Sequence, residues 1–368
     1  MTQPTRGRWD HIDWLRGLAV LAMFQTHLYD AFVRDGERTG DAWWASRHVG
    51  GFPARLFLFL AGVSLVLRWH RDARAGTSDA AATRGAVRRG LEVLAIGLAF
   101  RVVEWTLGGA YLASAGDMLR VDILNTIGVS LVACALVCRP VELRRRVPWV
   151  ALAATALVIL CTPFVELSPV ASAEPRWLFA YLAGEKPLAY FPCFPWAGYT
   201  FAGVACGAIW LRASARGRLT HTTLAMAALG VGMAIAGQLL RDPQVTLWSF
   251  GDNQARVTGP NAFLYRTGVV LALVGLSALA IRLLPPGRFS PLRTLGKTSL
   301  LTYWVHVELV YGHTTKSLYH RLSFGEATVA LAALTAGMLA LAWWRLERLP
   351  GLIERTRAWL RRAEEPVG

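Results

Sequence analysis

Ten long apolar stretches constrain the fold of this chain more than any other feature. Each contains roughly 20 residues, which is the length that a helix needs to cross the hydrocarbon core of a bilayer. Of the 368 residues, 54% are hydrophobic and 17% are charged, whereas about a quarter of the residues in a soluble domain are charged. The sequence therefore predicts an all-α integral membrane protein of about ten transmembrane helices around a polar cavity. The predicted helices are 12–33, 53–70, 87–105, 121–138, 148–165, 192–211, 220–240, 262–283, 297–312 and 325–345.

The positive charges are distributed unevenly between the loops. One alternating set, which includes both termini, holds 24 of the 39 Lys and Arg residues, and the opposite set holds 10. The positive-inside rule places the 24-charge side in the cytoplasm, so both termini are expected there and the number of spans is even. This placement accounts for the net charge of +15. Nucleic-acid binding is not expected, because the basic loops lack interleaved aromatic residues.

We expect residues 1–349 to form one multi-pass membrane domain and residues 350–368 a basic amphipathic tail on the cytoplasmic surface. In that tail, Trp359 and Leu360 would enter the lipid headgroups while neighbouring arginines meet anionic lipid. No cleavable signal peptide is expected, because the first apolar run is long and is preceded by Asp13 and Arg16. The expected location is the cell (inner) membrane if the source is bacterial.

Cysteine usage gives no sign of a metal site. The five cysteines form no C-x-x-C pair, so neither a zinc site nor a disulfide framework is predicted, and no metal is expected.

The first apolar stretch carries ionisable residues that membrane helices usually exclude. Arg16 and His27 are eleven residues apart, which is three turns plus about 20°, so both lie on one helix face about 16 Å apart along the axis. Asp30 follows His27 by three residues and can hold one nitrogen of its ring. Charged groups at membrane depth are costly and usually mark a function. The structural alternative is a buried histidine bonded to a backbone carbonyl.

Five sequence segments, in order along the chain, resemble the motifs of transmembrane acyltransferases. They are IDWLRGLA at 12–19 followed by His27, FLFLAGVS at 57–64, DILNTIG at 122–128, FPWAG at 194–198, and LGKTSL at 295–300 followed by Tyr303 and His306. The arginine and histidine of the first segment look like the R-x10-H signature of the acyltransferase-3 type. The DIL and FPW segments are similar to those of the heparan-α-glucosaminide N-acetyltransferase type, which is the branch that we favour.

The resemblance implies transfer of an acyl group, with acetyl preferred, from cytoplasmic acyl-CoA to an extracytoplasmic sugar or envelope acceptor. Arg16 and Asp13 would serve the donor, since a guanidinium binds phosphates bidentately. His27 would act as general base or take the acyl group itself, and the sequence leaves both routes open. Acyl-CoA is then the co-substrate, and membrane lipid and a glycan are the other partners.

One departure from the family concerns the position of the catalytic histidine. In lysosomal relatives the proposed histidine lies in the first extracytoplasmic loop, and an amide residue occupies the position of His27. His48 lies in that loop here, but its spacing to the second motif differs. We therefore assign the role to His27, with His48 as the alternative.

Other polar residues have two interpretations each. Arg55 either contacts the acceptor or extends to the interface. Asp122 and Asn125 either line the acceptor entrance or cap a helix. His306 either shares the cavity or is a core histidine. Arg101 and Glu104 are expected to pair, because they are three residues apart on one helix.

A proton-coupled transporter of a small molecule or lipid-linked sugar is the alternative function, since intramembrane arginine and histidine suit proton coupling. Inverted repeats with helices broken at matching positions would support it, and we find none in the sequence. Stabilisation by acyl-CoA would distinguish the enzyme from the transporter.

Overall fold

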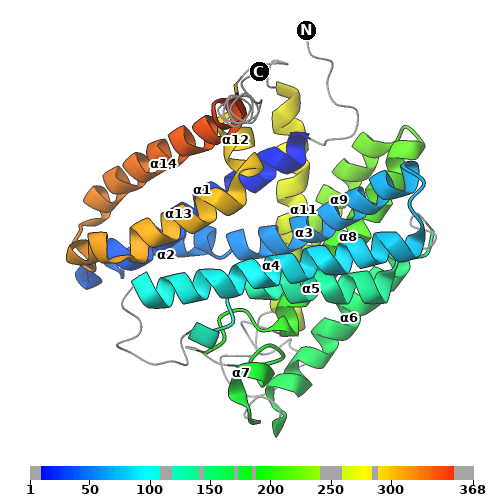
Figure 1. Cartoon of the computed structure of the whole chain (residues 1–368), viewed down its shortest axis with the longest axis horizontal. Helices are drawn as coiled ribbons and strands as arrows, with labels where there is room; N and C mark the ends of the chain where they lie inside the picture. The colour runs from blue at the N-terminus through cyan, green and yellow to red at the C-terminus, as the bar shows by residue number, and fades with distance from the viewer. Residues whose placement is uncertain are drawn as a thin grey trace, which may run out of the picture. The chain divides into compact units, whose positions relative to one another are not determined.

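The computed structural model of the chain describes residues 10–107, 118–140, 145–169, 173–184, 188–240, 259–283 and 289–351 (Figure 1). These residues divide between two compact units, Met1–Gly50 with Ile281–Gly368, and Gly51–Ala280. Within the described ranges the secondary structure is helical, apart from two isolated backbone bridges. Most of the predicted cytoplasmic tail, residues 352–368, lies outside the described ranges.

The first unit joins the N-terminal helix to the last helices of the chain. It contains α1 (Asp10–Phe32), α2 (Asp41–Gly50), α12 (Pro291–Lys297), α13 (Ser299–Tyr311) and α14 (Phe324–Glu347), with short 3-10 turns η1 (Asp35–Glu37) and η5 (His313–Leu318). α1 packs against α2, α12, α13 and α14. The helix that carries Arg16 and His27 is therefore the centre of this unit.

The C-terminal end of α1 is fixed by the segment that precedes α14. The backbone N–H of Leu322 donates to the carbonyl of Phe32 at 2.9 Å, and the N–H of Arg34 donates to the carbonyl of Leu322 at 2.9 Å. Apolar side chains of α1 and Trp43 of α2 pack with Val310 of α13 around this point. These contacts fix the position of the last turns of α1, where His27 lies.

At its other end, α1 crosses α12 with the two backbones in direct contact. A Cβ added to Gly17 would lie 1.8 Å from the carbonyl oxygen of Leu292, and one added to Gly296 would lie 1.9 Å from that of Asp13. Only glycine permits such an approach, and small residues bring membrane helices together in this way.

The second unit is a separate helical bundle. It contains α3 (Pro53–Arg74), α4 (Asp79–Leu107), α5 (Ile123–Cys138), α6 (Val147–Glu166), α7 (Arg176–Phe179), α8 (Cys193–Ala215), α9 (Leu219–Leu239) and most of α11 (Pro260–Leu283). α4 lies along α5, and α8 packs against both α3 and α6 (Figure 1). α8 is the core helix of this unit, since most of its residues are buried.

α3 and α8 also meet through glycine. A Cβ on Gly62 would lie 2.1 Å from the carbonyl oxygen of Thr200, and a Cβ on Gly203 would lie 1.9 Å from that of Phe59. This contact brings the first turns of α3 and α8 together, so that Arg55 faces Trp196 of the FPWAG segment and the adjacent Tyr199.

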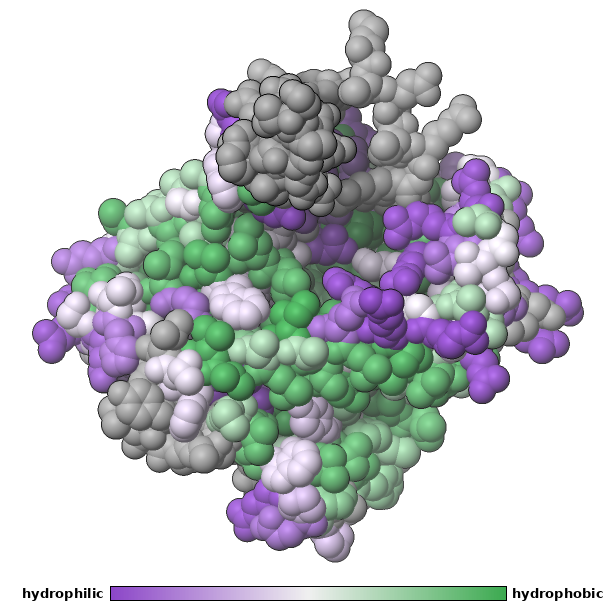
Figure 2. All heavy atoms as spheres, in the orientation of Figure 1, coloured by the Kyte–Doolittle hydropathy of each residue, from purple (hydrophilic) through white to green (hydrophobic). Residues whose placement is uncertain are grey.

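Each predicted span coincides with a helix, and the ninth, 297–312, corresponds to α13. Within the described ranges, five segments are long and apolar enough to cross a membrane: Asp41–Arg74, Val147–Glu166, Leu219–Leu239, Pro260–Leu283 and Phe324–Glu347. Figure 2 shows a broad hydrophobic area on the viewed face, as expected of helices that contact lipid. The number of ten crossings and the side of each terminus stay predictions.

Among the described residues, the short elements η1, α2, α7, α12 and η5 were not predicted as helices. α2 lies in the segment between the first two predicted spans, is ten residues long and buries only Trp43 and Ser46.

Candidate functional site

His27 and His306 form a hydrogen-bonded pair inside the first unit. Nδ1 of His27 in α1 lies 2.9 Å from Nε2 of His306 in α13. The two rings are stacked, with their centroids 5.1 Å apart and their planes 12° from parallel. His306 is fully buried, whereas His27 is partly exposed. The pair therefore connects a buried imidazole to one that solvent or substrate can reach.

A backbone carbonyl determines which nitrogen of each ring carries the proton. Nδ1 of His306 lies 2.8 Å from the carbonyl oxygen of Thr302. A carbonyl only accepts, so Nδ1 of His306 is the donor and, in the neutral ring, Nε2 is the acceptor. Nδ1 of His27 then donates to Nε2 of His306, and neutral His27 carries its lone pair on Nε2. This is the tautomer that a general base needs when its other nitrogen is held by a neighbour.

Aromatic rings surround the pair. The ring centroids of Phe24 and Tyr303 lie 4.8 and 5.8 Å from that of His306, and the centroid of Tyr311 lies 5.6 Å from that of His27. These rings limit the rotation of both imidazoles and exclude water from one side.

Asp30 has a different partner from the predicted one. Its Oδ1 accepts a hydrogen bond from Nη1 of Arg47 in α2 at 3.1 Å, and both side chains are about half exposed. The spacing of three residues would let Asp30 reach His27, but Arg47 offers the carboxylate a charge partner near the surface. The structure therefore corrects the predicted contact, because the neighbour at Nδ1 of His27 is His306.

Arg16 and Asp13 lie together near the start of α1. Nη1 of Arg16 donates to Oδ1 of Asp13 at 3.0 Å, and the side chains are 21% and 5% exposed. α1 thus holds an ion pair in its first turns and an imidazole eleven residues further along. Arg16 and Asp13, the two residues predicted to serve the donor, are therefore in contact, as their spacing of three residues on one helix implies.

His48, the alternative to His27, lies on α2. Its ring is exposed, and its Nδ1 lies 2.8 Å from the carbonyl oxygen of Trp44, one turn earlier. This contact ties the ring of His48 to its own helix.

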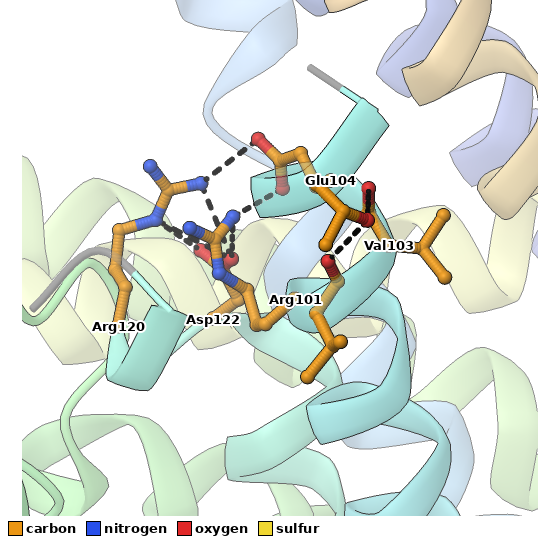
Figure 3. Close-up of polar contacts among 7 residues, drawn as sticks. Arg101, Val103, Glu104, Arg120 and Asp122 are labelled. Atoms are coloured by element: carbon orange, nitrogen blue, oxygen red, sulfur yellow. Dashed lines mark hydrogen bonds and ion pairs between the residues drawn. The ribbon is translucent and has the colours of Figure 1, made fainter. Parts of the chain in front are cut away.

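A network of ion pairs lies in the second unit (Figure 3). Arg101 of α4 pairs with Glu104, as predicted, and its Nη1 lies 3.3 Å from Oδ2 of Asp122. Arg120 closes the network, with its Nη2 3.4 Å from Oε1 of Glu104 and 3.3 Å from Oδ2 of Asp122. Two positive and two negative side chains balance one another here. This balance favours a structural role for Asp122 over a place at an acceptor entrance.

The predicted capping role of Asp122 is not observed. Asp122 occupies the position before α5, but its carboxylate caps no backbone N–H and instead bonds the two arginines. Arg120, which the sequence analysis did not single out, also stacks on Tyr190 at 4.9 Å. Burial disfavours the charged form of Arg120, but Asp122 and Glu104 outweigh it and raise its pKa.

Asn125 is fully buried one turn into α5. Its Nδ2 donates to the hydroxyl of Tyr181 at 3.0 Å. Its Oδ1 is buried without a hydrogen-bond partner among the described residues. The remaining predicted residue, Arg55, is buried beside Trp196 and Tyr199.

The described part of the chain contains no group of three or more His, Cys, Asp or Glu side chains that could hold a metal ion.

Comparison with known proteins identifies a family for this chain. No curated protein matches the chain. The model of the heparan-alpha-glucosaminide N-acetyltransferase catalytic family matches residues 8–240. This range covers more than half of the 368 residues and includes His27, Arg55 and Asp122, whereas His306 lies beyond it. The chain therefore belongs to the heparan-alpha-glucosaminide N-acetyltransferase catalytic family.

Proposed function

We propose that this protein transfers an acetyl group from cytoplasmic acetyl-CoA to an amine or hydroxyl of a sugar or envelope acceptor on the far side of the membrane. The family indicates a membrane N-acetyltransferase that uses acetyl-CoA. The observation that carries the site assignment is the hydrogen bond between His27 and His306.

In the proposed reaction, His27 removes a proton from the acceptor through Nε2. The acceptor nitrogen or oxygen then attacks the thioester carbon, a new C–N or C–O bond forms, and the C–S bond breaks. The coenzyme A thiolate leaves and takes the proton back from His27, so the enzyme ends as it began. His27 supplies the proton transfer that typically contributes about 10²- to 10⁴-fold to rate.

His306 is the proposed positioning residue. While His27 is protonated, its Nδ1–H stays bonded to Nε2 of His306, whose own Nδ1–H is bonded to the carbonyl of Thr302. The positive charge is thereby spread over a chain of hydrogen bonds that ends on the backbone. This arrangement resembles a catalytic triad in logic, with a neutral imidazole in place of the carboxylate.

Arg16 and Asp13 are proposed to hold the donor. The guanidinium of Arg16 would bind phosphate oxygens of coenzyme A. Asp13 would orient this guanidinium through the 3.0 Å ion pair. The charge distribution of the loops supports a cytoplasmic position for this end of α1, the side on which acetyl-CoA is available.

Substitution of His27 by Ala tests the catalytic assignment. With wild-type expression and folding, we expect kcat for acetyl transfer to fall by about 10²-fold or more. A variant that transfers acetyl at the wild-type rate would remove His27 from the mechanism. His48→Ala is the matched control, and a large loss there instead would move the role to the loop histidine.

The same preparation distinguishes direct transfer from an acyl-enzyme. Labelled acetyl-CoA is added without acceptor, and the denatured protein is examined for label. A stoichiometric label that His27→Ala abolishes would establish a covalent acetyl-imidazole, and its absence with transfer intact would establish direct attack.

A further inference from the structure

The guanidinium of Arg55 is buried among aromatic rings, and no carboxylate of the described residues pairs with it. Arg55 lies in the first turn of α3 and is 7% exposed. Its Nε donates to the hydroxyl of Tyr199 at 3.3 Å, and its Cζ lies 4.8 Å from the ring centroid of Trp196. In the described part of the chain it forms no ion pair with Asp or Glu. A buried charge without a counter-charge is expensive, so such a position needs an explanation.

Arg101, a buried arginine of the same unit with a structural role, differs from Arg55 in its charge partners. Its side chain is 1% exposed, and it pairs with both Glu104 and Asp122. Two carboxylates thus neutralise Arg101, while two aromatic residues surround Arg55. The difference indicates that the counter-charge for Arg55 comes from a molecule that binds.

In the described part of the chain, the guanidinium of Arg55 hydrogen-bonds through Nε to the hydroxyl of Tyr199, and its two terminal nitrogens make no hydrogen bond. Its Cζ lies over the ring of Trp196. The N–H groups of the two terminal nitrogens lie in the plane of the guanidinium and form the fork that matches a carboxylate or a phosphate. Trp196 packs edge-on against Phe191 at 4.8 Å, and Tyr199 stacks on Phe263 at 4.4 Å. The aromatic support is therefore held in place.

We propose that Arg55, supported by Trp196 and Tyr199, binds an oxyanion of a substrate, either a carboxylate or a phosphate. The identification of the bound molecule as a substrate rests on the proposed acetyltransferase function. The loops before α3 and α8 both belong to the set with few positive charges, which the charge rule places outside the cytoplasm. A carboxylate on the acceptor is therefore the expected source, and the phosphates of acetyl-CoA are the other.

Equilibrium binding to the purified full-length protein tests the proposal without turnover. The probes are D-glucuronate, D-glucose as its uncharged counterpart, and acetyl-CoA, each titrated into wild type, Arg55→Gln and Arg68→Gln. Arg68 is the matched control, because it lies on the same helix but pairs with Asp72 at 3.7 Å and is 37% exposed. We expect wild type and Arg68→Gln to bind glucuronate more tightly than glucose. Arg55→Gln should lose about tenfold or more in glucuronate affinity, the usual value of a charge-assisted hydrogen bond.

Each other outcome is decisive. A loss confined to acetyl-CoA would keep the oxyanion site and assign it to the donor. Unchanged affinity for both anions in Arg55→Gln would overturn the proposal. If Arg55→Gln does not fold, Tyr199→Phe removes only the hydroxyl at Nε, and we expect it to weaken anion binding several-fold while glucose binding is unchanged. Failure here is distinct from failure of the proposed function, since His27→Ala should bind both anions and still lose transfer.

Discussion

Nδ1 of His27 and Nε2 of His306 are 2.9 Å apart although 279 residues separate them in the sequence. The carbonyl of Thr302 fixes the proton on the far nitrogen of His306 and so fixes both tautomers. The partly exposed imidazole of His27 therefore carries its lone pair on Nε2, the ring nitrogen that is not bonded to His306.

Replacement of His306 by Phe should slow acetyl transfer without weakening substrate binding. The ring volume is retained, but the acceptor for Nδ1–H of His27 is lost, so we expect kcat to fall by about 10²-fold while KM stays within about threefold. The measurement is steady-state transfer kinetics with saturating acetyl-CoA. A purely structural role would lower the amount of folded protein and leave kcat per folded molecule unchanged.

His306→Gln provides the matching rescue. The amide oxygen of Gln can accept from Nδ1–H of His27, whereas Phe cannot. We expect Gln to recover part of the rate that Phe loses. Equal rates in the two variants would show that the hydrogen bond between the imidazoles is not what His306 contributes.

Asp30→Asn should have little effect on transfer. The carboxylate bonds Arg47 at a half-exposed position, and such surface pairs contribute about 0–1 kcal/mol. We expect kcat/KM within about threefold of wild type, and the same for Arg47→Gln. A loss as large as that of His306→Phe would restore Asp30 as the residue that orients His27.

Local patterns predicted the helices and several residues of the site, but not how distant residues pair. Hydropathy located each of the ten helices, because apolar periodicity is a local property. His27 and His306 were both singled out, yet nothing in either segment encodes the contact between the first and ninth spans. Asp30 was paired with His27 on spacing alone, because an exposed Arg47 from an unpredicted helix was not considered.

The residues that the sequence analysis missed lie at helix ends. Arg120 precedes α5 by three residues and was counted as a loop charge. Of the aromatic neighbours of Arg55, Trp196 was recorded only as part of the FPWAG motif and Tyr199 was not singled out. Their contact with Arg55 depends on the packing of α3 against α8 through Gly62 and Gly203. Close approach of two helices is a tertiary property that a single helix does not reveal.

Acid should loosen the connection between the first loop and α14. Oδ1 of Asp35 lies 2.8 Å from Nδ1 of His320, and this bond is the main cause of the lowered pKa of Asp35. Oε2 of Glu37 accepts from the N–H of Phe324 at 2.6 Å, which lowers the pKa of Glu37. Both carboxylates thus have folded pKa values below their unfolded values of about 3.9 and 4.3. Their stabilisation is present above those values and is lost as pH falls through the folded ones.

The double variant Asp35→Asn/Glu37→Gln measures this contribution. Its Tm should lie below that of wild type at pH 7, and the gap should close as pH falls below about 4. The measurement is the Tm of the purified protein in detergent, determined by thermal unfolding from pH 3 to 7. A Tm difference that is constant across this range would contradict the assignment, and His320→Gln should reproduce the Asp35 part alone.

Gly296→Ala should destabilise the first unit more than any exposed glycine substitution. A Cβ at Gly296 would lie 1.9 Å from the carbonyl oxygen of Asp13, so α1 and α12 must separate to admit it. Overpacking of this kind typically costs about 1–3 kcal/mol, and more where backbone must move. The shift would also displace Asp13 and with it the ion pair to Arg16, so we expect weaker acetyl-CoA binding together with a lower Tm.

Gly337→Ala on α14 is the matched control, because nothing lies within 4 Å of its added Cβ. The control should be neutral or stabilise by up to about 1 kcal/mol, since alanine is the better helix former. Equal Tm values for the two variants would show that the backbones of α1 and α12 are not in contact at Gly296.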